Sequence, residues 1–67
     1  MRLEDVRLGM RVRVPSGPYR GRVGMVLETR QDLLRDIVTV LVDGWPWPVR
    51  FKPDELEPAE EVASGGA

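Results

Sequence analysis

The hydrophobic positions of this chain alternate with polar ones in short runs, a period of two residues that is typical of β-strands. The alternation is clearest over residues 10–14 and resumes over residues 22–29. Residues 37–42 are almost continuously apolar and rich in valine and isoleucine, which favours a third strand. A fourth strand is predicted over residues 49–52, where the chain becomes apolar again after two prolines.

The alternation also assigns side chains to faces. In the first run one face carries Met10, Val12 and Val14 and the other carries Arg11 and Arg13. In the second run Val23, Met25 and Leu27 lie on one side and Gly24 and Val26 on the other. A glycine inside a strand weakens it, so Gly24 indicates a bulge, a tight coil or a close approach of another backbone.

Glycine and proline mark the connections between these runs. Residues 15–21 contain two prolines and two glycines, so neither a helix nor a paired strand can pass through them. Asp43-Gly44 is a dipeptide that commonly closes hairpins. Residues 30–36 are predicted to form a loop with about one turn. Residues 53–56 begin with proline and predict a single tight helical turn, with Leu56 closing the end of a barrel.

Four or five short strands in fewer than about 60 residues predict an all-β fold, because an open sheet of this size would leave long edges unpaired. We expect a small five-stranded SH3-like barrel over residues 1–58, with a short 3-10 turn before the last strand. Residues 59–67 are acidic and glycine-rich and contain too little apolar surface to offset the entropy of ordering them. They are predicted to form a flexible tail.

Length and composition exclude several classes of function. A chain of 67 residues has a thin core, and this chain contains neither cysteine nor histidine. Disulfides, soft-ligand metal sites and an activated serine or cysteine nucleophile are therefore excluded. No apolar run approaches the roughly 20 residues of a membrane-spanning helix, and the first residues lack the pattern of a secretory signal. We expect a soluble, cytoplasmic, non-enzymatic protein that needs no cofactor and no metal.

The formal net charge of −1 conceals a strong asymmetry along the chain. Residues 1–30 contain seven arginines and three acidic residues, a balance of +4, whereas residues 31–67 contain three basic and eight acidic residues, a balance of −5. Nine of the ten basic residues are arginine, which favours bidentate contacts to phosphate or carboxylate. A genome rich in G and C would also replace lysine by arginine, so this preference has two interpretations.

The loop over residues 15–21 is the strongest candidate for a binding site. We expect four arginines on or beside it to form one basic patch: Arg11, Arg13, Arg20 and Arg22. Pro18 and Tyr19 lie at its tip. The Tyr19 ring is expected either to stack on a base or enter a protein groove, or to fold back over the barrel.

Two further apolar pairs are candidates for contact with a partner. Trp45 and Trp47 are separated by one residue and stiffened by prolines, an arrangement typical of an interface anchor. We expect Trp45 to be the exposed indole and Trp47 to cover the small core. Leu33 and Leu34 either pin their loop to the core or present an apolar patch, and the sequence does not separate these alternatives.

The residues around the loop resemble a known motif. Val12-Arg13-Val14, Gly17-Pro18-Tyr19, Gly21, Gly24 and Val26 resemble the KOW motif of ribosomal proteins and of NusG-type transcription factors. The resemblance is closest to the C-terminal domain of the transcription factors, whose final strands are similar to Pro48-Val49-Arg50-Phe51 and Leu56-Glu57. It covers roughly residues 6–58.

This resemblance implies a module that docks on RNA, the ribosome or the RNA polymerase assembly. A second resemblance leads to an alternative. Val49-Arg50-Phe51 followed by Asp54-Glu55-Leu56-Glu57 looks like the ending of small barrel subunits in photosynthetic electron-transport complexes. That resemblance implies an accessory subunit held by protein contacts, with the basic face directed at an acidic protein. The oligomeric state is left open by the sequence.

Overall fold

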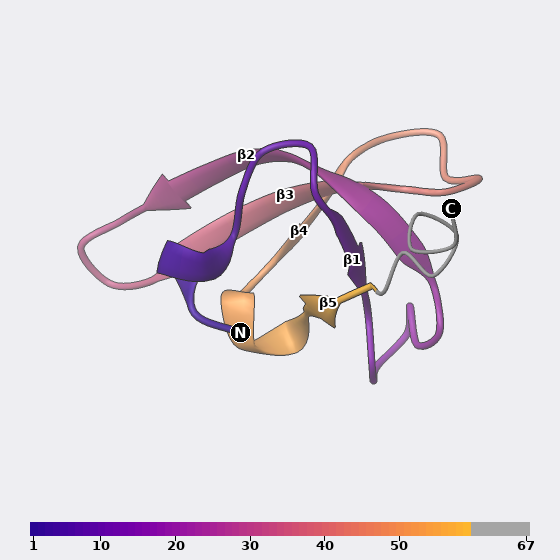
Figure 1. Ribbon diagram of the computed structural model, residues 1–67, viewed down its shortest axis with the longest axis horizontal. Coiled ribbons are helices and arrows are strands. Elements are labelled where there is room, and N and C mark those ends of the chain that lie inside the picture. Colours follow the sequence, from indigo (N-terminus) through magenta and orange to yellow (C-terminus); the bar gives the residue numbers. More distant parts are fainter. Residues whose placement is uncertain (60–67) are drawn as a thin grey trace, which may run out of the picture.

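Five antiparallel strands form one sheet in the order β4-β3-β2-β1-β5 in the computed structural model, which describes residues 1–59 (Figure 1). The strands are β1 (Arg11–Arg13), β2 (Val23–Gln31), β3 (Asp36–Val42), β4 (Val49–Phe51) and β5 (Glu57–Pro58), and the short 3-10 helices are η1 (Leu3–Asp5) and η2 (Pro53–Glu55). The predicted all-β, five-stranded fold with a 3-10 turn before the last strand is confirmed. Residues 60–67, most of the predicted tail, lie outside the described residues.

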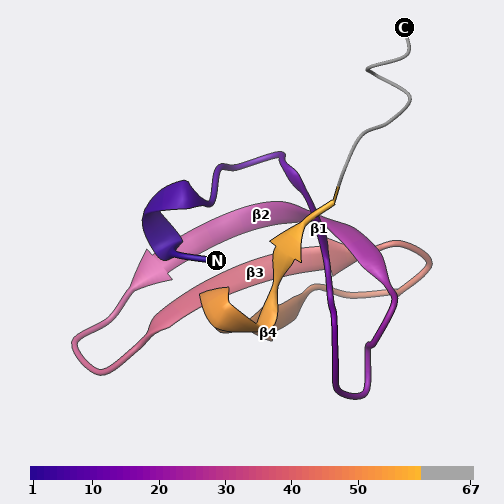
Figure 2. The ribbon, with the colours of Figure 1, turned by 60° about the horizontal axis from the view of Figure 1, so that its bottom comes forward.

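The connection between the two edge strands indicates that the sheet is curled. In a flat sheet β4 and β5 would lie about 19 Å apart, four strand spacings. Only residues 52–56 join them, and η2 occupies three of these, rising about 2 Å per residue. The edges must therefore approach each other, and Figure 2 shows η2 and β5 crossing in front of the β2–β3 hairpin. This topology is compatible with the predicted SH3-like barrel.

The core within this curled sheet is small and rich in valine. Among residues 1–59 nine side chains are buried: Val6, Val12, Val14, Val26, Val38, Val40, Val42, Phe51 and Leu56. The β-branched valines suit a pleated surface because their restricted rotamers lose little freedom on packing there. The inward positions predicted for Val12, Val14 and Leu56 are confirmed, and Met10 packs against the same cluster.

Gly24 marks a close approach between β2 and β3. It lies opposite Val42 in the β2–β3 ladder. A methyl group added at Gly24 would come within 2.5 Å of the Leu41 carbonyl oxygen and 2.9 Å of the Val42 Cα atom. The predicted close approach of another backbone is thus confirmed. The face that carries Gly24 and Val26 is the buried one.

The β2–β3 hairpin is longer than the sequence pattern predicts. Its pairing continues to Gln31 and Asp36 after a register shift between Val26 and Glu28. The Asp32 N–H then donates to the Arg35 carbonyl oxygen at 2.9 Å and closes the turn. The loop predicted over residues 30–36 is therefore wrong at both ends, because ladder hydrogen bonds continue into its polar residues.

None of the helices in residues 1–59 is long and apolar enough to cross a membrane.

Candidate binding surface

Two loops on one side of the sheet, residues 14–22 and 43–48, form the candidate surface. The first is folded by short backbone bonds, in which the Arg20 N–H donates to Gly17 at 3.1 Å and the Gly21 N–H to Val14 at 2.7 Å. Gly17 and Gly21 both have positive φ, which explains the glycines at these two turns. These bonds fix the position of Tyr19, which lies between the two turns, and leave Pro18 exposed at the tip.

Tyr19 joins the two loops to the core. Its ring lies edge-to-face with Trp45 at a centroid distance of 5.3 Å and with Phe51 at 5.7 Å. Aromatic pairs of this geometry contribute about 0.5–1.5 kcal/mol beyond their buried area. Of the two alternatives for Tyr19, the structure has the ring folded back over the barrel. We refer to Tyr19, Trp45 and Phe51 as the aromatic cluster.

The two tryptophans have the opposite roles to those predicted. Trp45 is half-buried in the aromatic cluster, with the Arg22 guanidinium 5.6 Å from its ring centroid. Trp47, predicted to cover the core, is 63% exposed. The prediction was wrong, because the Tyr19 ring packs on Trp45 and draws that indole toward the core. The Nε1 donor of Trp45 is buried and has no hydrogen-bond partner among residues 1–59.

The predicted arginine patch divides into two parts. Arg11 forms two hydrogen bonds with the Asp43 carboxylate, one of them at 3.1 Å, and Arg13 lies 3.8 Å from the Glu57 carboxylate. Both arginines thus have an acidic partner within the fold, in pairs that stay partly exposed to solvent. Arg20 and Arg22 are exposed and have no ion-pair partner among residues 1–59. The structure therefore leaves Arg20 and Arg22 as the cations of this loop that can meet a ligand.

Arg11 also affects the titration of its partner. Its guanidinium hydrogen-bonds the Asp43 carboxylate and lowers the pKa of Asp43 below the ordinary value of 3.8. A lowered pKa in the folded state stabilises the fold above the unfolded pKa, and this contribution is lost as the pH falls through the folded value. Asp43 is exposed, so solvent screening keeps the effect small.

We therefore expect Asp43→Asn to lower the melting temperature at about pH 7, and the difference from the unsubstituted chain to shrink below about pH 4. Melting curves recorded across this pH range measure the effect. Asp54→Asn is the matched control, since Asp54 is an exposed carboxylate with no ion pair among the described residues. A constant difference between Asp43→Asn and the unsubstituted chain down to pH 2 would contradict the role of the ion pair.

Beside the aromatic cluster lies an open hollow of about 570 Å³. Its lining includes Tyr19, Trp47 and Arg50, with Glu28 as an acidic member. Arg50 was not among the sequence candidates, although its position could have been found. It alternates with Val49 and the buried Phe51 along β4 and must therefore point outward. We call the exposed side chains of Arg20, Arg22, Trp47 and Arg50, together with Tyr19, the loop face.

The chemistry available on the loop face is that of binding. Exposed guanidinium groups pair with phosphate or carboxylate, and an exposed indole stacks on bases or enters an apolar pocket. In residues 1–59 no group of three acidic side chains is placed to hold a metal ion.

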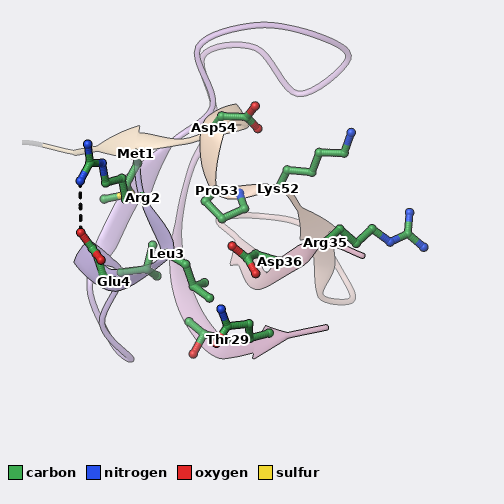
Figure 3. Close-up of a pocket in the computed structure, with 12 residues that line it drawn as sticks. Met1, Arg2, Leu3, Glu4, Thr29, Arg35, Asp36, Lys52, Pro53 and Asp54 are labelled. Atoms are coloured by element: carbon green, nitrogen blue, oxygen red, sulfur yellow. Dashed lines mark hydrogen bonds and ion pairs between the residues drawn. The ribbon is translucent and has the colours of Figure 1, made fainter. Parts of the chain in front are cut away.

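A larger hollow of about 980 Å³ lies at the opposite end of the hairpin, beside η1 and η2 (Figure 3).

The fold and this surface define a small all-β domain. Comparison with models of known protein families finds no match, and comparison with curated proteins finds no similar sequence.

Proposed function

We propose that this protein is a non-enzymatic binding module that docks on RNA, within the ribosome or the transcription machinery, through the loop face. The observation that carries the proposal is the contact between Tyr19 and Trp45. This contact holds the two loops together. The loop face therefore combines Arg20 and Arg22 from the first loop with Trp47 from the second. The resemblance of residues 6–58 to KOW domains supports the same ligand.

The exposed groups suit a single strand of RNA better than a duplex. An indole offers a stacking surface for an unpaired base, and guanidinium groups neutralise the neighbouring phosphates. If Arg20, Arg22 and Arg50 each contact one phosphate, the logarithm of the binding constant should fall with the logarithm of salt with a slope of about −2. With a pI near 5.3 the chain carries a slight net negative charge at neutral pH, so its overall charge does not attract nucleic acid. The attraction would have to come from the basic side chains of the loop face.

A second candidate, an accessory subunit held by protein contacts, is favoured by the two ion pairs. Because Arg11 and Arg13 are engaged with Asp43 and Glu57, the basic surface is only part of what the sequence predicts. An exposed tryptophan between prolines is also a common anchor at protein interfaces. On this interpretation Trp47 would enter an apolar pocket of the larger complex.

The double substitution Arg20→Glu with Arg22→Glu separates the two candidates. We expect it to weaken binding to a single-stranded RNA oligonucleotide at low salt by about 10- to 100-fold, because two phosphate contacts are lost and two repulsions are introduced. Fluorescence anisotropy of the labelled RNA measures the change. Arg7→Glu with Arg30→Glu is the matched control, because it makes the same change in net charge at exposed positions outside the loop face.

Equal losses in the two double variants would mean that only net charge matters, and would contradict a defined site on the loop face. No measurable RNA binding by the unsubstituted chain at low salt would remove the RNA proposal altogether. In that case a Trp47→Ala variant that no longer binds its protein complex would favour the accessory subunit.

A further inference from the structure

The far end of the β2–β3 hairpin extends beyond the neighbouring strands. The ladder with β1 ends at Met25, and β4 pairs with β3 only from Val38 onward. Residues 28–37, which we call the arm, therefore form a two-stranded ribbon that projects from the sheet (Figures 1 and 2). Within the part of the chain that the structure describes, no further strand pairs with this ribbon.

The tip of the arm carries the two most exposed large apolar side chains of the described residues. Leu33 is 100% exposed and Leu34 is 94% exposed. Two hydrogen bonds close the turn that carries them. The Leu33 N–H donates to the Asp32 carboxylate at 2.8 Å, and the Asp32 N–H donates to the Arg35 carbonyl oxygen. The turn thus presents two adjacent leucine side chains to solvent, and their burial against a partner would remove apolar surface from water.

The same end of the molecule carries the hollow of about 980 Å³ beside η1 and η2. Its apolar lining includes Leu3, Val6 and Pro53, while Asp36 and Lys52 supply charges of both signs. In Figure 3 Leu3, Asp36 and Pro53 lie around the middle of the hollow, and the Lys52 side chain extends away from it. We call this hollow the arm groove, because Asp36 of the arm belongs to its wall.

We propose that two copies of the chain form a symmetric dimer in which the Leu33–Leu34 tip of each copy fills the arm groove of the other. The arm lies against its own groove, so tip and groove occupy one end of the molecule. A single two-fold axis at that end brings each tip to the other copy's groove and closes the assembly. No further copies can then add through the same surfaces.

Two properties favour a second copy as the occupant. The arm groove carries charges of both signs, with Asp36 and Lys52 in its lining, and the arm tip carries Asp32 and Arg35. A surface of mixed charge can be complementary to its own copy, which an acidic or a basic surface alone cannot be. The core consists of nine side chains, with neither disulfide nor metal ligands of the soft kind in the chain. Chains of this size commonly gain the missing burial by oligomerisation.

The test measures molecular mass against concentration by analytical ultracentrifugation. We expect a monomer–dimer equilibrium, and we expect Leu33→Asp with Leu34→Asp to raise its dissociation constant by at least about 100-fold, since apolar side chains are lost from both halves of the contact. Leu8→Asp is the control, because Leu8 is also an exposed leucine, 68% accessible, and lies outside the arm and its groove. It should leave the dimer unchanged.

Three results would overturn the proposal. A chain that remains monomeric at about 1 mM, where weak small-area encounters are still populated, would assign the leucines to a different protein or to a lipid surface. A dimer that survives the double substitution would place its contact elsewhere. Equal loss in the Leu8→Asp variant would do the same.

Cross-linking provides a second, independent measurement, because the chain contains no cysteine. A mixture of Leu34→Cys and Asp54→Cys chains should form the mixed disulfide in preference to either homodimer, since Asp54 lines the arm groove. Replacing Leu34→Cys by Leu8→Cys in the mixture should abolish this preference. RNA binding measured below the dissociation constant of the dimer does not depend on the arm, so the dimer and the RNA proposal can fail separately.

Discussion

Replacing Gly24 with alanine is expected to lower the free energy of unfolding by about 3 kcal/mol, the upper end of the usual range for overpacking. The added methyl group would lie 2.5 Å from the Leu41 carbonyl oxygen and 2.9 Å from the Val42 Cα atom. Both are backbone atoms of β3, so no side-chain rotation relieves the contact. The strands β2 and β3 would have to separate where Gly24 faces Val42.

The loss would be a large fraction of the total stability. At the usual 0.05–0.15 kcal/mol per residue, a chain of this length has about 3–10 kcal/mol available. Urea denaturation followed by tryptophan fluorescence measures the change. Gly17→Ala is the matched control, because Gly17 has a φ of +86° but no atom within 4 Å of the added methyl group. It should cost about 1–2 kcal/mol through backbone strain alone, and a greater loss there than at Gly24 would contradict the packing explanation.

The strands could be predicted because their signals are local. Alternation over residues 10–14 fixed the faces of β1, and the dense β-branched run predicted β3 within one residue. The extension of β2 to Gln31 could not be predicted in this way. It depends on a register shift near Leu27 and on hydrogen bonds to residues of β3, and neither leaves a signal in the polar sequence of β2.

The candidate site was predictable in its location and not in its details. The glycine and proline content identified the loop that carries Arg20 and Arg22. Ion pairs such as that between Arg11 and Asp43 join residues distant in sequence, so they follow from strand register and not from composition. The exchange of roles between the two tryptophans has the same origin, since Tyr19 selects its partner through packing across two loops.

The aromatic cluster makes the loop face depend on the core. Phe51 is buried among the valines and also contacts Tyr19, whose ring holds Trp45. A change at Phe51 therefore affects both the stability of the core and the position of the loop. It removes apolar burial from the core, and it releases the ring that fixes the loop carrying the exposed arginines.

Phe51→Ala is accordingly expected to lower the free energy of unfolding by about 3–5 kcal/mol, as usual for a buried phenylalanine. Phe51→Leu should cost less than about 1.5 kcal/mol, since it keeps most of the volume. The milder variant should still loosen the loop, because leucine cannot form the edge-to-face contact with Tyr19. Urea denaturation measures the first effect, and hydrogen exchange of the Arg22 amide, bonded to the Tyr19 carbonyl at 3.0 Å, measures the second.

The variant Leu56→Ala separates the loss of core stability from the release of the loop. Leu56 is buried in the same core but is not part of the aromatic cluster, and its loss should cost about 2–5 kcal/mol. In that variant the Arg22 amide should exchange through global unfolding, in step with the amides of β3. In Phe51→Leu it should exchange faster than those amides, through local opening of the loop, and the RNA binding proposed above should weaken while the fold remains intact. Parallel exchange of loop and strand amides in both variants would contradict a loop held in place by Phe51.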